Sequence, residues 1–235
     1  IGVALVIGVI WNYFIKPEGN AVFLFGGAAV IVSAIILDAM AYKRMELTRL
    51  EERAKAGLLK TSKLIASPKG LILSLVSGVL MGSFFPLVEL GKSWGGGMGP
   101  YAIGFVFSIG VFFSTFVFNL FFMNLPVQGE PVEVRDYFLR GGLKQHLLGI
   151  LGGVIWYTGA ITNFVAASAE KEAQVGPAVS YALGQGATMV SALWGLLVWK
   201  EFAGSDSRVK ILLFVMFVLF GVGLGLVSMA PVIGK

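Results

Sequence analysis

Long apolar runs separated by short polar stretches dominate the chain. We distinguish seven runs, most of them near the 20 or so residues that an α-helix needs to cross the hydrocarbon of a bilayer. Lipid offers no hydrogen bonds to the backbone, so each run is predicted to be a helix. Alternation at period two, as in the strands of a membrane barrel, is absent. The runs occupy residues 1–15, 21–42, 71–90, 101–125, 147–169, 175–199 and 211–230.

The first run is shorter than a full span and begins without a methionine. We therefore expect its helix to start upstream of the sequence. Composition supports lipid as the solvent, because only 13% of the residues are charged, whereas about 25% is usual in soluble domains. Mean hydropathy is +0.85. The chain has no cysteine, which excludes disulfides and thiolate metal sites, and we expect neither a metal nor a cofactor.

Basic residues are distributed unevenly among the connections. The connections 43–69, 126–146 and 200–210 contain 14 of the 18 Lys and Arg residues, and the alternate connections contain one each. Because cytoplasmic loops carry the positive excess, these three are predicted to be cytoplasmic and the C-terminus to lie outside. The net charge of +5 is thereby explained without nucleic acid. We predict a multi-pass protein of a cell membrane, plasma or inner.

The 43–69 connection is predicted to be a basic cytoplasmic linker. Met45, Leu50, Ala54 and Leu58 recur at roughly helical spacing among charges, which indicates a cytoplasmic or interfacial helix. A phosphate-binding loop is not indicated, because the sequence 57–61 lacks the glycine five residues before its lysine. His146, at the start of a predicted helix, is interpreted as a solvated loop histidine.

A partial internal repeat divides the chain. The sequence 8–11 (Gly-Val-Ile-Trp) parallels 195–199 (Gly-Leu-Leu-Val-Trp), and each is followed by a polar turn and a helix rich in Gly, Val and Leu. Duplicated halves are common in transporters, which bind substrate between them. We predict that 1–42 holds the last two helices of a first repeat and that 70–231 is a second repeat of five helices. Ten transmembrane helices would then make the intact protein.

Three short motifs resemble a known family. They are Asn12-Tyr13-Phe14, Phe85-Pro86-Leu87, and the sequence 190–195 (Val-Ser-Ala-Leu-Trp-Gly) followed by Glu201. In these the chain is similar to the ureide permease family of the drug/metabolite transporter (DMT) superfamily, close to its sugar-uptake branches. The resemblance implies an all-α membrane protein with a two-repeat helical bundle, and transport of a ureide, nucleobase or sugar. The chain departs from the family in having no nucleotide-binding motif in the central loop and in having Glu89 where a neutral polar residue is usual.

Glu89 is the first candidate site residue. An ionised carboxylate in hydrocarbon is costly, so it usually faces a cavity or a partner. The helical face that includes Phe85 and Glu89 is small and polar, and Pro86 disturbs the backbone one turn earlier. Glu89 could couple protons or hydrogen-bond a substrate; alternatively it lies at the outer interface beside Lys92. Asp38 is the second coupling candidate, and an interfacial ion pair near Lys43 is its alternative interpretation.

The fifth and sixth runs supply amides, hydroxyls and aromatic rings suited to an uncharged polar solute. Interhelical hydrogen bonding is the alternative interpretation of these side chains. The candidates for substrate binding are Glu89, Phe85, Trp156, Asn163, Tyr181, Gln185, Thr188 and Ser191.

The seventh run has Gly221 and Gly225 at a spacing that lets another helix approach closely. The partner helix could belong to the same subunit or to a second copy in a homodimer. Together these features predict a secondary transporter that works by alternating access, with lipid, a small polar solute and protons as partners. A channel and a non-transporting receptor or assembly subunit are the alternatives. An enzyme is disfavoured by the single histidine, the missing cysteine and the scarcity of acids near the membrane.

Overall fold

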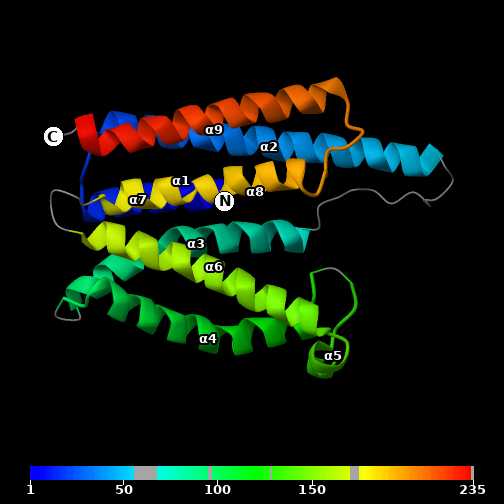
Figure 1. The fold of residues 1–235 in the computed structure, drawn as a ribbon, viewed down its shortest axis with the longest axis horizontal. Coiled ribbons are helices and arrows are strands. Elements are labelled where there is room, and N and C mark those ends of the chain that lie inside the picture. The colour runs from blue at the N-terminus through cyan, green and yellow to red at the C-terminus, as the bar shows by residue number, and fades with distance from the viewer. Residues whose placement is uncertain (56–67, 95–96, 128, 170–174, 234–235) are drawn as a thin grey trace. The chain divides into compact units, whose positions relative to one another are not determined.

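The computed structural model describes residues 1–55, 68–94, 97–127, 129–169 and 175–233, and these contain helices and connections without strands. The helices are α1 (Gly2–Ile15), α2 (Ala21–Lys55), α3 (Pro68–Trp94), α4 (Pro100–Asn124), α5 (Val134–Leu139), α6 (Leu143–Ser168), α7 (Pro177–Gly184), α8 (Gly186–Leu197) and α9 (Ser207–Ile233) (Figure 1). They form two compact units. Unit 1 comprises Ile1–Glu89 and Val175–Lys235, and unit 2 comprises Leu90–Gln174.

Five helices in the described part of the chain, α2, α3, α4, α6 and α9, are long and apolar enough to cross a membrane. They coincide with five of the seven predicted runs, and the first run forms the shorter apolar helix α1. The prediction of a single helix for the sixth run was wrong. Residues 175–199 do not form one helix but two, α7 and α8, which meet at Gln185.

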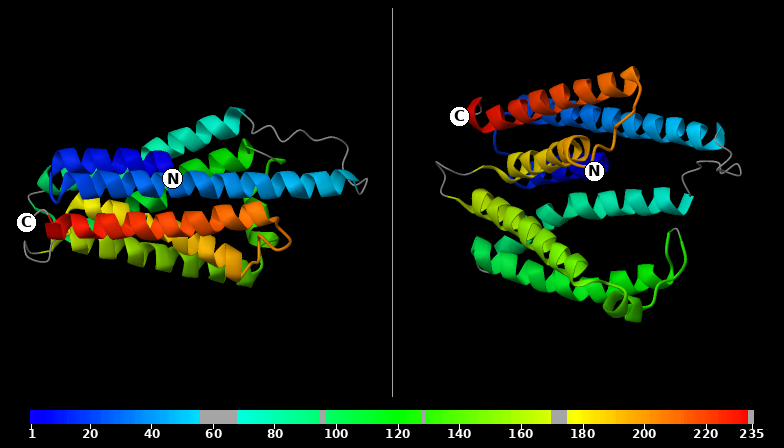
Figure 2. Two further views of the ribbon diagram at one scale, coloured as in Figure 1. Left: turned by 90° about the horizontal axis from the view of Figure 1, so that it is seen from above. Right: turned by 45° about the vertical axis from the view of Figure 1, so that its right-hand side comes forward.

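Helices α2 and α9 form the main packing interface of unit 1 and run antiparallel, side by side in all views (Figures 1 and 2). Near one end, the N–H of Asn20 donates to the carbonyl of Ala230 over 2.8 Å. At the other end, Arg44 donates two hydrogen bonds to the carboxylate of Asp206 at 3.0 and 3.1 Å. Buried apolar side chains such as Ile31 and Phe220 fill the space between the two helices.

Glycines let α1 approach its neighbours in unit 1. A Cβ atom on Gly82 of α3 would lie 2.8 Å from the carbonyl oxygen of Ala4, and one on Gly8 would overlap the ring of Tyr181 in α7. The small face predicted for the third run is thus a close packing surface against α1.

The connections of unit 1 gather at its two ends. Glu18, in the connection predicted to lie outside, contacts Gly176 at the start of α7. The opposite end brings the basic 43–49 part of α2 beside the 200–206 turn, where Arg44 meets Asp206. Connections assigned to the same side of the membrane therefore lie together within the unit.

The basic connection after the second run does not begin as a separate helix. Instead α2 continues without interruption to Lys55, about 20 Å beyond Tyr42 at 1.5 Å per residue. The rest of the predicted linker helix, 56–67, lies outside the described residues.

Unit 2 is built on the antiparallel pair α4 and α6. The ring of Phe107 lies 5.9 Å from Trp156 and 5.7 Å from Phe164, measured between centroids, and Gly104 makes room for Ile161. The connection between the two helices contains α5, which begins with a capping box between Glu133 and Asp136. A helix within this connection, which is predicted to be cytoplasmic, was not predicted from the sequence.

Candidate functional site

The break between α7 and α8 is centred on Gln185, which is flanked by Gly184 and Gly186. The N–H of Gln185 donates to the carbonyls of Ala182 and Leu183 and not to that of Tyr181, as it would in a regular α-helix. On the other side of the break, the N–H of Thr188 donates to the carbonyl of Gln185 over 3.0 Å. The segment therefore tightens at this point and continues as a second helix.

The break lies near the middle of unit 1. Of the two helices that meet at the break, α7 starts beside Glu18 at one end of the unit. Gln185 follows the 8 residues of α7. Gln185 is therefore roughly 13 Å from that end at 1.5 Å per residue. The 12-residue helix α8 continues toward the 200–206 turn. Discontinuous helices whose break falls near the bilayer midplane are the usual location of substrate sites in transporters.

Two of the predicted site residues meet next to this break. The rings of Phe85 and Tyr181 lie 6.0 Å apart between centroids, and both side chains are almost fully buried. The hydroxyl of Tyr181 lies 3.1 Å from the carbonyl oxygen of Ala4 in α1 and 3.2 Å from that of Met81 in α3. In this arrangement Tyr181 holds three helices together, one turn before Gln185.

The remaining candidates at the break and in α8 differ in exposure. Gln185 and Thr188 are half-buried, whereas Ser191 is exposed. Glu89 is half-buried near the end of α3, at the boundary of unit 1.

Trp156 and Asn163 belong to α6 of unit 2, where Trp156 is 50% exposed and contacts Phe107. Whether these two side chains share a solute passage with Gln185 stays a prediction.

Asn12 is a buried polar residue that the sequence did not single out as a site residue. Its side chain is fully buried, and its amide nitrogen donates to the carbonyl of Gly8 over 2.7 Å. Its Oδ1 atom is buried without a hydrogen-bond partner among the described residues. An asparagine in the last turn of an otherwise apolar run was the signal that could have identified it.

A second polar cluster surrounds Asp38 at the predicted cytoplasmic end. One turn along α2, the hydroxyl of Tyr42 donates to the carboxylate of Glu201 over 2.5 Å. The guanidinium of Arg49 donates to the backbone carbonyl of Glu201. The ion pair of Arg44 is made with Asp206, and the Oδ1 atom of Asp38 is buried without a partner among the described residues.

The long apolar helices, the broken α7–α8 segment and the buried polar groups beside it define a helical membrane protein. A sequence profile described as Ureide permease matches residues 45–230, so the chain belongs to the ureide permease family. It is accordingly a transporter of small solutes and not an enzyme. No curated protein and no solved structure matches the chain.

Proposed function

We propose that this protein is a secondary transporter of a small uncharged polar solute and that the solute binds at the break between α7 and α8. The observation that carries the proposal is the interruption of the helix at Gln185. Here the amide side chain of Gln185 lies near the middle of unit 1. Beside it is the backbone carbonyl of Tyr181, which does not accept its regular hydrogen bond from the N–H of Gln185. Both can bond to a solute without a compensating charge.

The chemistry of these groups favours a ureide as substrate. A ureide presents N–H donors and carbonyl acceptors side by side, and an amide such as that of Gln185 complements both. Nucleobases have a similar pattern of donors and acceptors, and sugars have hydroxyls alone. Since the family profile is that of a ureide permease, we place ureides first, nucleobases second and sugars third.

We further propose the two-repeat architecture of the DMT superfamily, with alternating access between the repeats. In support, α2 and α9 are the corresponding final helices of the two predicted repeats, and they pack against each other where Gly27 faces Gly223. A moving interface between repeats would expose Gln185 to each side of the membrane in turn.

Uptake by the intact protein tests the proposal. Liposomes containing it are offered radiolabelled allantoin, uracil or glucose, one representative of each class. Saturable accumulation of allantoin, competed by excess unlabelled allantoin, is the expected result. Fluxes that do not saturate and never exceed equilibration would indicate a channel. Failure to move any of the three solutes would favour a receptor or assembly subunit.

Proton coupling is a separate proposal. Glu89 and Asp38 are the carboxylates that we place on the transport path, with Glu89 as the first candidate because it follows the proline-containing turn of α3. If Glu89 couples protons, then Glu89→Gln abolishes accumulation driven by a pH gradient while exchange of internal for external solute continues. Full accumulation by Glu89→Gln would exclude it, and Asp38→Asn would then be tested in the same way.

A further inference from the structure

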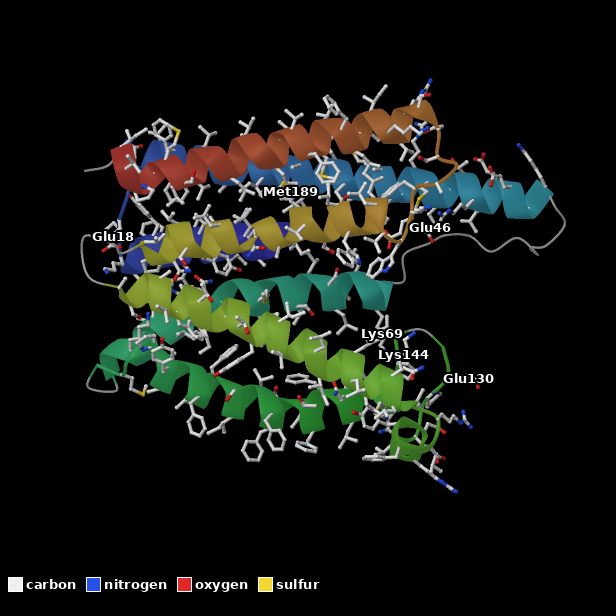
Figure 3. All side chains as sticks on the ribbon, in the orientation of Figure 1. Glu18, Glu46, Lys69, Glu130, Lys144 and Met189 are labelled. Carbon is white, nitrogen blue, oxygen red and sulfur yellow. The ribbon has the colours of Figure 1, made fainter. Side chains whose placement is uncertain are left out.

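Unit 2 contains a large open cavity that the sequence did not predict. Its volume is about 1430 Å³, and it is lined by the second half of α4, the connection with α5, and the first two turns of α6. Figure 3 labels Glu130 of its wall at the end of the unit where α5 lies. The polar side chains lining it are Thr115, Glu130, Asp136, Arg140, Gln145 and His146.

The wall of the cavity is held in place by local hydrogen bonds. The N–H of Val132 donates to the carbonyl of Met123, at the end of α4, over 2.9 Å and so folds the connection back onto the helix. The N–H of Glu133 donates to Asp136 over 3.3 Å. Asp136 also pairs with Arg140 at 2.9 Å. These interactions fold the connection back onto α4 and hold the two ends of α5.

The sequence indicated that His146 is a solvated loop histidine. In the structure it instead belongs to the wall of this cavity. It lies in the first turn of α6 and is half-buried. Its ring meets that of Tyr137 edge-on, with 4.7 Å between centroids. The two rings are inclined at 67° to each other, so each presents its own face beside the hydrogen-bonding groups of Arg140 and Gln145.

The charges of the lining identify the kind of ligand. Glu130 and Asp136 are acceptors, Arg140 is a donor, and Gln145 can be both. An anionic ligand such as a phospholipid headgroup would face two carboxylates against one guanidinium. A neutral planar molecule with adjacent N–H and carbonyl groups would satisfy acceptors and donors together while its face rests on the ring of Tyr137.

We propose that this cavity is a vestibule in which a ureide-like solute binds on the predicted cytoplasmic side, before or after it passes through the protein. This inference rests on the proposed function. The volume exceeds that of one small heterocycle, so the remaining space is filled by water. The vestibule therefore raises the local concentration of solute and does not enclose it.

Transport kinetics measured separately from each side test the proposal. The intact protein is reconstituted in two separate vesicle preparations, one for each orientation. The KM for allantoin is then determined from the cytoplasmic face in one preparation and from the outer face in the other. We expect Arg140→Gln, and independently His146→Phe, to raise the cytoplasmic KM roughly three- to tenfold through the loss of one hydrogen bond. The outer KM should stay unchanged. His146→Phe keeps a ring against Tyr137, so its effect reports the lost ring nitrogens.

Arg135→Gln is the matched control, because Arg135 lies on α5, the helix that ends just before Arg140, but does not line the cavity. It should leave both KM values unchanged. The vestibule is refuted if wild-type protein transports allantoin and the two variants leave the cytoplasmic KM unchanged, or raise the KM from both sides equally. Absence of allantoin transport by the wild type would instead refute the proposed substrate, and the vestibule assignment with it.

Discussion

Gly27 and Gly223 face each other across the contact between α2 and α9. A Cβ atom on Gly27 would lie 2.8 Å from the carbonyl oxygen of Gly223, and one on Gly223 would lie 3.0 Å from the carbonyl oxygen of Gly27. A side-chain atom is nearer still at each position, Val227 Cγ2 and Ile31 Cγ1 at 2.7 Å, but the backbone atoms cannot rotate away as a side chain can. The closeness of the two helices thus depends on the absence of a side chain at both positions.

Replacing Gly27 by alanine should therefore destabilise unit 1. Overpacking of this kind costs about 1–3 kcal/mol, and we expect a lower midpoint of thermal unfolding in detergent. Gly26→Ala is the control, since a Cβ atom at Gly26 would meet no atom within 4 Å. Equal midpoints for Gly27→Ala and wild type would contradict the observed packing.

The hydrogen bond from Tyr42 to Glu201 should stabilise the attachment of the 200–206 turn to α2. Tyr42→Phe removes the donor and leaves the ring against Phe202, where the centroids are 4.8 Å apart. A bond to a charged acceptor contributes about 1.5–3 kcal/mol, so unfolding should occur at lower temperature or denaturant concentration. Tyr101→Phe serves for comparison, because Tyr101 is 71% exposed. Similar stability losses in both variants would show that the Glu201 contact contributes nothing specific.

The stability of the end of unit 1 that contains the 200–206 turn should fall in acid. The N–H of Val209, 2.9 Å from Asp206, lowers the pKa of that carboxyl, with a further contribution from the adjacent Arg44. A folded-state pKa below the unfolded one means that the stabilisation is complete above the unfolded value of 3.8 and disappears as the pH falls through the folded value.

Asp206→Asn should remove this part of the acid sensitivity, and the measurement is the unfolding midpoint between pH 6 and pH 3. Arg208→Gln, also at the start of α9, should keep most of the sensitivity because the main contribution comes from the backbone of Val209. An unchanged pH profile in Asp206→Asn would argue against the low pKa.

The helix break makes a prediction about affinity. Gln185→Leu keeps a side chain that is unbranched at Cβ and of similar size but removes the amide, so a solute bound at the break loses one or two hydrogen bonds. We expect KM for the transported solute to rise about tenfold at unchanged expression. Val190→Ala, an exposed position on the same helix, should transport normally. Wild-type KM in Gln185→Leu would place the substrate elsewhere.

Much of the fold was predictable because hydrocarbon imposes a simple rule on the backbone. A run such as 211–230 must be helical in lipid, and α9 covers it. The position of a break is set differently. Gly184 and Gly186 could equally have been a packing stripe within one helix, and the local bonding around Gln185 is decided by neighbouring helices.

Contacts between distant parts of the chain were the least predictable. Tyr42 and Glu201 are 159 residues apart, and no local pattern connects them. By contrast, α5 left a local signal that was overlooked, because Glu133 and Asp136 have the spacing of a capping box. A Cβ atom on Gly221 or Gly225 would meet no atom within 4 Å. These glycines therefore do not pack against α2, and their role in contacting another helix stays a prediction.

Tyr181 has one hydroxyl proton and two carbonyl oxygens within reach, one on α1 and one on α3. A single O–H can donate fully to only one acceptor at a time. If α1 and α3 shift against each other, the proton can turn from Ala4 to Met81 without leaving the hydroxyl unbonded. Rotation of this one hydroxyl therefore keeps α7 hydrogen-bonded to one neighbouring helix while the other neighbour moves.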